Sequence, residues 1–447
     1  MKKQSLVLIL VATGAVLTHS FADTQNIRIS GDIRTRGYYF AQAMDGNVSW
    51  QGNAAFIEQR TRVTVEAELE DHILAVVTFK AEGLWGASDQ SSTAGAGTED
   101  DAGGAINRGW SVGVDEAYVQ INEMFYSAAT LKVGRQYLNY GRGLIISSFD
   151  QEYNFDAGRL ILDYFPLTVD LVGARLADNG SFGGDSNHQS TEMLWINTRY
   201  VMTDSAVKDI EVYFGWIPQS AHNGTSSTNV PPSLNGASPW LIGARGDLTP
   251  ADSLKIWFEA AYESGADGTV NNETISAFIV NAGANYELKD VGWSPVLHAN
   301  YIGASGGGKD GRSNFLPWFN YQEGYNGYVF VPNLSNIHIF NLGTSIKPHQ
   351  NTAFSVQGYY YMKFDANSPA GGNINMDYGG LEFTRVTPQA NSNYLGWEID
   401  STLTYNYSRD VRLQLIHGAF IPGAAYQKTQ FASAVAHEVR AEIYVKF

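Results

Sequence analysis

Arginines recur on one face of two neighbouring extended segments near the N-terminus. Arg34 and Arg36 alternate with uncharged residues, and Arg60 and Arg62 do the same about 25 residues later. A guanidinium group stays charged and can bind carboxylate, sulfate or phosphate through two parallel hydrogen bonds. If the two segments pair as antiparallel strands, the four arginines cluster near the middle of the strand pair. The pattern therefore predicts a site that attracts anions.

Further arginines extend this candidate anion path. Period-two alternation also places Arg159, Arg199 and Arg245 on the polar face of their segments, which would line the inside of a closed sheet. Arg135 and Arg175 do not match the alternation unless a glycine next to or near each one marks a bulge. Of the 17 arginines, 12 fall within the first 245 residues, so basic charge is concentrated on one arc. The predicted lumen and selectivity residues are Arg34, Arg36, Arg60, Arg62, Arg135, Arg142, Arg159, Arg199 and Arg245.

Acidic residues on the same faces support an alternative interpretation. The predicted constriction acids are Glu58, Glu116, Asp150 and Asp156. Inward acids are about as numerous as inward arginines, so each arginine could simply be paired to an acid and stiffen a wall. The segment 139–156 is partly apolar and carries Arg142, so we expect it to pack against something and to form the constriction.

Extended segments with period-two alternation recur along the whole chain, and helical spacing fits none of them. In 253–263, for example, Leu254, Ile256 and Phe258 oppose Lys255 and Glu259. The predicted strands are about 27–40, 55–70, 72–85, 111–122, 129–138, 157–164, 168–176, 191–201, 209–217, 239–248, 253–263, 274–288, 294–304, 336–347, 352–364, 394–408, 410–420 and 437–447.

The connections between these strands alternate between short turns and long polar loops. Short turns fall near residues 71, 166 and 409, and long loops cover 86–110 and 365–393. This alternation predicts an all-β, transmembrane, up-and-down antiparallel β-barrel of about 18 strands. A closed ladder leaves no unpaired backbone edge in hydrocarbon. A soluble all-β fold is the alternative, but it has no reason to alternate its loop lengths.

Both ends of the chain indicate export to a bacterial outer membrane. Lys2 and Lys3 precede a short apolar stretch, and Ser20-Phe21-Ala22 fits a cleavage site, so residues 1–22 are predicted to be a cleaved signal peptide. An N-terminal membrane anchor is the alternative. The last ten residues form an amphipathic strand closed by Phe447, which resembles the C-terminal sorting signal of outer-membrane barrels. We expect one barrel domain over 23–447, with both termini in the periplasm.

Composition excludes several classes of function. The formal net charge is −16, which argues against nucleic acid as a partner, and no segment is apolar and long enough for a membrane-spanning helix. The chain has no Cys, and its nine His show no metal-ligand spacing. Gly303-Ala304-Ser305-Gly306-Gly307 matches a nucleophile-elbow pattern, but no helix start follows. We therefore predict no enzyme activity, catalytic residue, metal or cofactor.

Two sequence blocks are more specific than the alternating pattern that all barrel strands share. One is Leu131–Gln136, followed by Tyr140-Gly141-Arg142-Gly143-Leu144, and the other is Asn154–Leu160. Together with Glu58–Arg62 and Asp115–Val119, they resemble the alginate-export family of outer-membrane porins. The resemblance is clearest over residues 27–175. It implies an 18-stranded barrel with a basic constriction that passes a uronate polysaccharide.

Three functions follow from these patterns. The first is passive passage of anionic polysaccharide or oligosaccharide, with outer-membrane lipid and periplasmic export components as the expected partners. The second is a general or substrate-specific porin for other small solutes, and the third is a plugged structural or adhesin barrel. Inward aromatics such as Trp195 and Tyr361 would stack on sugar rings under the first function, or fill space beneath loops under the others.

Overall fold

The computed structural model describes most of the chain after the predicted signal peptide. The described residues are 26–41, 53–69, 72–86, 110–148, 153–178, 190–203, 205–218, 234, 236–267, 273–307, 313–320, 326–368, 376–378, 381–383, 392–425 and 435–447. Residues 1–22 and Asp150 lie outside them. Within these ranges, no helix has the length and apolar character needed to cross a bilayer.

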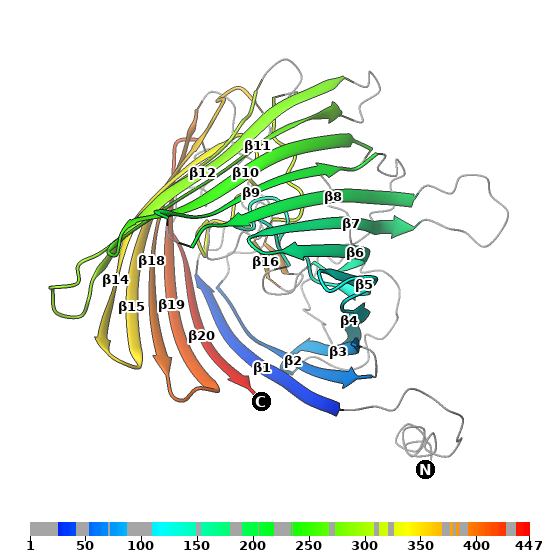
Figure 1. Ribbon diagram of the computed structural model, residues 1–447. Coiled ribbons are helices and arrows are strands. Elements are labelled where there is room, and N and C mark those ends of the chain that lie inside the picture. The colour runs from blue at the N-terminus through cyan, green and yellow to red at the C-terminus, as the bar shows by residue number, and fades with distance from the viewer. Residues whose placement is uncertain are drawn as a thin grey trace, which may run out of the picture.

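Eighteen strands form one antiparallel sheet that closes into a barrel (Figure 1). They are β1 (Asn26–Ala41), β2 (Ala54–Glu68), β3 (Ile73–Leu84), β4 (Ser111–Ile121), β5 (Ala129–Gln136), β6 (Phe155–Tyr164), β7 (Leu167–Asp178), β8 (Ser190–Val201), β9 (Val207–Trp216), β10 (Ser238–Ala251), β11 (Leu254–Ala266), β12 (Thr274–Glu287), β13 (Val296–Ala304), β14 (Ile337–His349), β15 (Thr352–Lys363), β18 (Tyr394–Asn406), β19 (Val411–Pro422) and β20 (Ala436–Lys446). Each predicted strand overlaps one of these strands, so the predicted fold class is confirmed.

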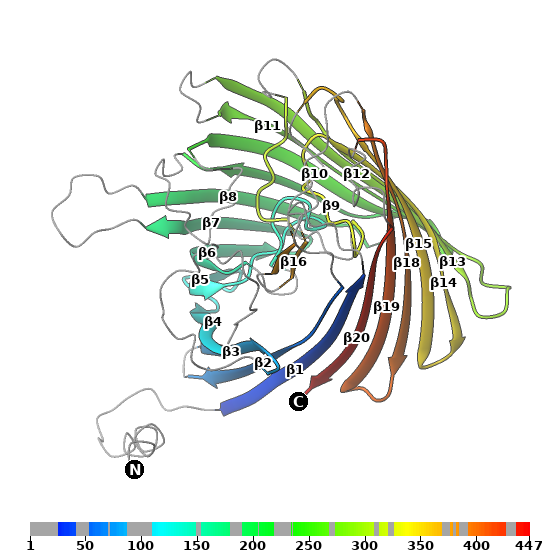
Figure 2. The same cartoon turned by 180° about the vertical axis from the view of Figure 1, so that it is seen from behind.

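The first and last strands close the barrel side by side (Figures 1 and 2). β1 pairs with β2 on one side and with β20 on the other. Gly31 and Phe447 exchange two backbone hydrogen bonds of 2.9 and 3.0 Å, so the terminal aromatic residue continues the ladder beyond β20. Because closure satisfies the backbone groups of both strands, the wall can lie in hydrocarbon without exposed polar edges.

The two ends of the barrel differ in their connections. Short turns, such as Phe165–Pro166 between β6 and β7, lie at the end where β1 begins and β20 finishes. We call this the short-turn end, and the opposite end the long-loop end. A small hairpin of β16 (Met376–Tyr378) and β17 (Leu381–Phe383) lies outside the barrel sheet and was not predicted.

The outer face of the barrel is mostly apolar. Ile29 and Leu342 are 68% and 69% exposed, and Trp397, Tyr405 and Tyr407 are also exposed, as the alternation predicts for residues that contact lipid. The opposite face of the same strands carries the charged and amide side chains. This arrangement is the reverse of a soluble protein, because the bilayer replaces the packed core as the apolar environment.

Among the described residues, three segments fold into the lumen and pack on the inner wall. These inner segments are residues 137–148, 313–320 and 326–336, and parts of them are visible inside the ring of strands in both views (Figures 1 and 2). Ile146 and Phe319 form a parallel β-bridge, and the Phe319 N–H donates to the Ile145 carbonyl at 2.9 Å. The side chains of Leu144, Ile145 and Ile146 are at most 2% exposed. The expectation that segment 139–156 packs against something is confirmed for its described residues.

Candidate functional site

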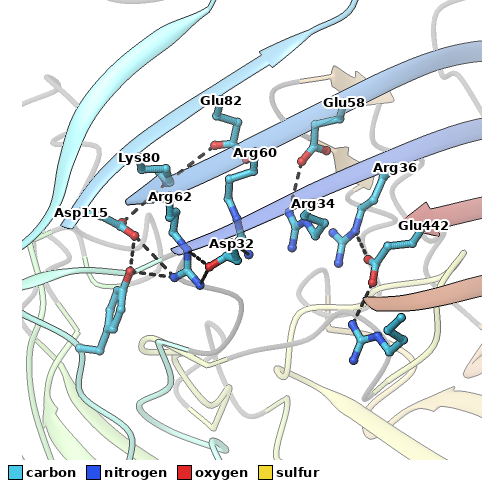
Figure 3. Close-up of polar contacts among 12 residues, drawn as sticks. Asp32, Arg34, Arg36, Glu58, Arg60, Arg62, Lys80, Glu82, Asp115 and Glu442 are labelled. Atoms are coloured by element: carbon cyan, nitrogen blue, oxygen red, sulfur yellow. Dashed lines mark hydrogen bonds and ion pairs between the residues drawn. The ribbon is translucent and has the colours of Figure 1, made fainter. Parts of the chain in front are cut away.

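The register of β1 and β2 brings the four N-terminal arginines together on the lumen face (Figure 3). Arg34 lies directly opposite Arg60, while Arg36 is opposite Glu58. Like charges directly opposite each other destabilise a strand pair unless other charges compensate. The predicted cluster therefore exists, and its stability depends on the acids around it.

Acids from both neighbouring strands flank the arginines of β1. Arg34 Nη2 lies 3.2 Å from Glu58 Oε1, and both side chains are less than 10% exposed. Arg36 Nε lies 2.7 Å from Glu442 of β20, which also accepts a hydrogen bond of 2.9 Å from Arg412 of β19. Because Glu442 is contributed by the closing strand, the seam of the barrel crosses this site.

A bulge in β4 places two consecutive acids on the lumen side. Thr78 of β3 is opposite Glu116, but Phe79 is opposite Val114, so Asp115 is the extra residue. Asp115 is 1% exposed. The predicted constriction acid Glu116 lies on the lumen face, but strict period two would have turned Asp115 outward.

Asp115 and Asp32 hold the cations of β2 and β3. Arg62 donates to the Asp32 carboxylate, and its Nη1 lies 3.8 Å from Asp115 Oδ2. Lys80 Nζ lies 4.0 Å from the other Asp115 oxygen, and the Tyr137 hydroxyl donates to Oδ2 (Figure 3). This network connects β1 to β4 and the beginning of the first inner segment.

The wall formed by β6 and β7 carries a second group of paired residues. Arg159 Nε donates to Asp170 at 2.7 Å, and the Tyr140 hydroxyl of the first inner segment donates to the same carboxylate at 2.8 Å. Burial raises the pKa of the Tyr140 phenol, so it stays a neutral donor. Arg159 retains 23% exposure of its side chain toward the lumen.

A third group spans β8 to β10. Arg245 Nε donates to Glu211 at 2.7 Å, and its Nη2 lies 3.1 Å from Asp209. Asp209 also accepts from Arg199 Nε at 3.0 Å, and Arg199 keeps 49% side-chain exposure. Arg245 also pairs with Asp247. Of these cations, Arg199 is the one most open to a passing solute.

Arg142 lies in the lumen at the tip of the first inner segment. Its Nη1 is 3.0 Å from Asp247, and its guanidinium carbon lies 4.6 Å from the centre of the Trp257 ring. The side chain remains 30% exposed. A cation held over an aromatic face and still accessible can contact an anion that passes through the lumen.

Buried carboxylates of the wall hold the inner segments through backbone N–H groups. Glu259 accepts from the Arg142 N–H at 2.8 Å, and Glu263 accepts from the Leu316 N–H at 2.8 Å. Glu398 accepts three backbone bonds of 2.7 to 2.8 Å from Tyr328, Val329 and Phe330. The sequence predicted only that inward acids could pair with arginines, so the role of these three acids in holding the inner segments was missed.

Two predicted lumen residues face away from the lumen. Arg135 shares its face with Val133, which is 50% exposed among the outward apolar residues, and it pairs with Asp156 of β6 at 2.8 and 2.9 Å. The β5–β6 register continues through Gly134 without a bulge, so the predicted inward position of Arg135 and Asp156 is wrong. Arg175, on β7, also faces outward.

The inward aromatics lie beneath the inner segments. Trp195 and Tyr361 are 1% and 0% exposed, and the Tyr361 hydroxyl donates to the Asn326 carbonyl at 2.6 Å. These rings fill space under the loops and cannot stack on a passing sugar in this conformation. Among the described residues, no group of three or more His, Cys, Asp or Glu side chains is placed to hold a metal ion.

A family model for alginate export matches residues 26–440, which covers nearly the whole predicted mature chain. The chain belongs to the alginate export family. The family assignment and the closed 18-stranded barrel identify this member as an outer-membrane porin. A search of curated protein sequences finds no match.

Solved porin structures share the fold of this family member. OpdK of Pseudomonas aeruginosa with vanillate has a TM-score of 0.58 at 10% identity, with coverage of 94% of this chain and 98% of that chain. OccK2 (OpdF) of the same organism with glucuronate gives 0.57 at 10%, with coverage of 95% and 97%. A BenF-like porin from Pseudomonas fluorescens Pf-5 gives 0.59 at 10%, with coverage of 95% and 99%.

Proposed function

We propose that this porin is a passive outer-membrane channel for anionic polysaccharide or oligosaccharide. The observation that carries the proposal is the distribution of inward cations along one side of the wall. We call Arg34, Arg36, Arg60, Arg62, Arg159, Arg199 and Arg245 the basic arc. It occupies β1, β2, β6, β8 and β10.

The opposite side of the lumen offers mainly amides. Asn285 and Asn300 lie half-buried on β12 and β13, and the Asn341 amide donates to Gln357 at 3.1 Å between β14 and β15. A chain of carboxylated sugars could therefore contact guanidinium groups on one side and neutral hydrogen-bonding groups on the other. Guanidinium–carboxylate pairing is geometrically specific, and amides suit sugar hydroxyls.

Pairing to acids leaves two residues of the basic arc within the solute's reach. Arg199 and Arg159 keep 49% and 23% of their side chains exposed while paired, and Arg142 of the first inner segment keeps 30%. Pairing limits how strongly a solute can bind, and a channel needs binding that is favourable but readily reversed. We therefore expect weak, reversible interaction with uronate oligomers.

Channel block tests this proposal. The purified protein in planar bilayers should show brief current interruptions with oligouronates, and their frequency should rise with oligomer concentration. Neutral oligosaccharides of the same length are the matched control and should interrupt the current much less. Equal block by charged and neutral oligomers would contradict the proposed substrate class.

A substrate-specific porin for small carboxylates is the second candidate, because the inner segments occupy much of the lumen. Phe315, Trp318, Phe319, Val329 and Phe330 are each at most 1% exposed. Two of the porins with the same fold have structures with vanillate and with glucuronate. This candidate predicts that liposomes swell with glucuronate but not with uronate oligomers. A plugged structural barrel predicts neither swelling nor current.

We further propose that residues 1–22 are removed and that both termini lie in the periplasm, where export components could reach the short-turn end. The location of both barrel termini at that end supports this orientation. A C-terminal epitope tag should be inaccessible to antibody on intact cells and accessible after the outer membrane is permeabilised. Labelling on intact cells would reverse the assignment.

A further inference from the structure

The outer face of β5 to β8 carries charge where a barrel wall is normally apolar. Arg135, Asp156, Arg175 and Glu192 lie side by side, because each is the direct register partner of the next. Arg135 pairs with Asp156, and Arg175 pairs with Glu192 at 2.8 Å. We call these four residues the outer charge row. Their side chains are 35% to 52% exposed.

The row takes the place of an aromatic belt. At the long-loop end, other strands present outward aromatic residues that suit the boundary between lipid and water. They include Tyr39, Trp216, Trp240, Tyr262 and Trp397, each at least 36% exposed. Over the described parts of β5 to β8, the outward position at that end is held by the outer charge row instead.

The barrel wall at β5 to β8 also contains a short strand and a hollow in its outer surface. β5 has 8 residues, against 16 in β1, and is the shortest strand of the described barrel. The row next to the charges reads Val133, Gly158, Gly173 and Leu194 in direct register. The two central glycines leave a hollow of about 420 Å³ in the outer surface. Bulk lipid is a poor neighbour for such a surface, because a short strand mismatches the bilayer and lipid chains pack poorly against a hollow wall.

We propose that this flank is the contact surface for a second copy of the same chain, related by a two-fold axis that passes between Gly158 and Gly173. A row of alternating sign with an even number of charges is complementary to itself under such a rotation. At its centre, Asp156 of each copy faces Arg175 of the other. In a two-fold contact, the same patch serves both subunits.

The glycines explain how two convex walls could meet. A barrel surface protrudes most at the contact axis, and small residues there let the two backbones approach closely, as small residues do in other membrane contacts. Val133 and Leu194 flank the axis and fill the space where the walls diverge. The outer charge row has no net charge, so it does not favour an anionic lipid headgroup over a protein partner.

Cysteine cross-linking in native membranes tests this contact, because the chain has no cysteine of its own. Gly158→Cys is the probe, since a Cβ at this position meets nothing within 4 Å. Leu342→Cys, outward on β14 and 69% exposed, is the matched control. Oxidation of isolated outer membranes should move Gly158→Cys to the mass of a dimer and leave Leu342→Cys a monomer. A monomer in both cases, or a monomer with lipid phosphate bound at this flank, overturns the proposal.

A charge reversal tests the complementarity itself. The variant R135E/D156R/R175E/E192R keeps the alternation within the row, and so remains complementary to itself but repels the wild-type row. With Gly158→Cys in both chains, co-expression should give like-with-like dimers and a loss of mixed dimers. Mixed dimers at the statistical proportion would show that the row does not direct the contact. Heat-modifiable migration on gels confirms that each variant is folded.

Discussion

The carboxylate of Asp115 meets Arg62, Lys80 and the Tyr137 hydroxyl at a position that is 1% exposed. Removing the carboxylate leaves Arg62 with Asp32 alone and Lys80 with Glu82 alone as counter-charges, whereas loss of an exposed acid costs little. The lumen wall is therefore stabilised by a small number of buried acids rather than by the total number of ion pairs. Asp115 owes this position to the bulge in β4.

Replacement of Asp115 tests this point at the scale of one side chain. We expect Asp115→Ala to lower the free energy of unfolding by about 1–3 kcal/mol, because Tyr137 loses its acceptor and Arg62 and Lys80 each lose one of two counter-charges. Urea unfolding of the protein in lipid vesicles measures the change. Asp163→Ala, which removes an exposed acid bonded to Thr168, is the control and should cost less than about 1 kcal/mol. Similar losses in the two variants would contradict this account.

At the scale of the element, β5 depends on a glycine that no other residue can replace without strain. Gly134 has a φ of +128°, and a Cβ there would lie 2.2 Å from the Ala117 carbonyl oxygen of β4. Gly158 on the neighbouring strand has open space at the same atom. The two glycines thus have different structural roles.

We expect Gly134→Ala to destabilise the barrel by about 1–3 kcal/mol or more, since strain and a backbone clash add together. Gly158→Ala should be nearly neutral. The fraction of heat-modifiable, folded protein after refolding into detergent compares the two. If both variants fold equally well, the close approach of β4 to Gly134 is not a constraint.

Three consecutive backbone N–H groups of the third inner segment are bound by one side chain. Glu398 receives three backbone N–H groups from residues 328–330 and is itself 0% exposed. Glu398→Ala should release the segment, raise single-channel conductance and increase current noise, because part of the constriction becomes mobile. Glu68→Ala, which removes an exposed acid 3.4 Å from Arg28, is the control. Unchanged conductance in Glu398→Ala would show that this segment does not limit the path.

Across the whole molecule, the strands could be predicted because lipid on one side and water on the other impose period two on every strand. The predicted segment 394–408 corresponds to β18, Tyr394–Asn406. The short turns mark where one strand ends and the next begins. Loop conformation has no such period. Nothing local in 313–320 or 326–336 shows that these residues turn inward, since their partners, Glu263 and Glu398, are distant in the sequence.

The same physics explains the errors in the candidate site. Parity placed Arg34, Arg60 and Arg245 on the lumen face, where the structure has them, because the register is regular there. The bulge at Asp115 interrupts the period-two alternation, so the alternation alone could not predict that Asp115 faces the lumen. Arg135 was assigned inward only by assuming a bulge at Gly134, and a positive φ without a register shift makes that assumption wrong.

The central claim is that the basic arc sets the ion preference of the channel, and a reversal potential in a KCl gradient tests it most directly. The wild-type channel should favour chloride, and the preference should weaken at high ionic strength as charges are screened. Replacing Arg34, Arg36, Arg60 and Arg62 together with Gln should shift the reversal potential toward the potassium side, whereas replacing them with Lys should retain much of the preference. A wild-type channel that prefers potassium, with the same reversal potential in the Gln variant, would contradict the account.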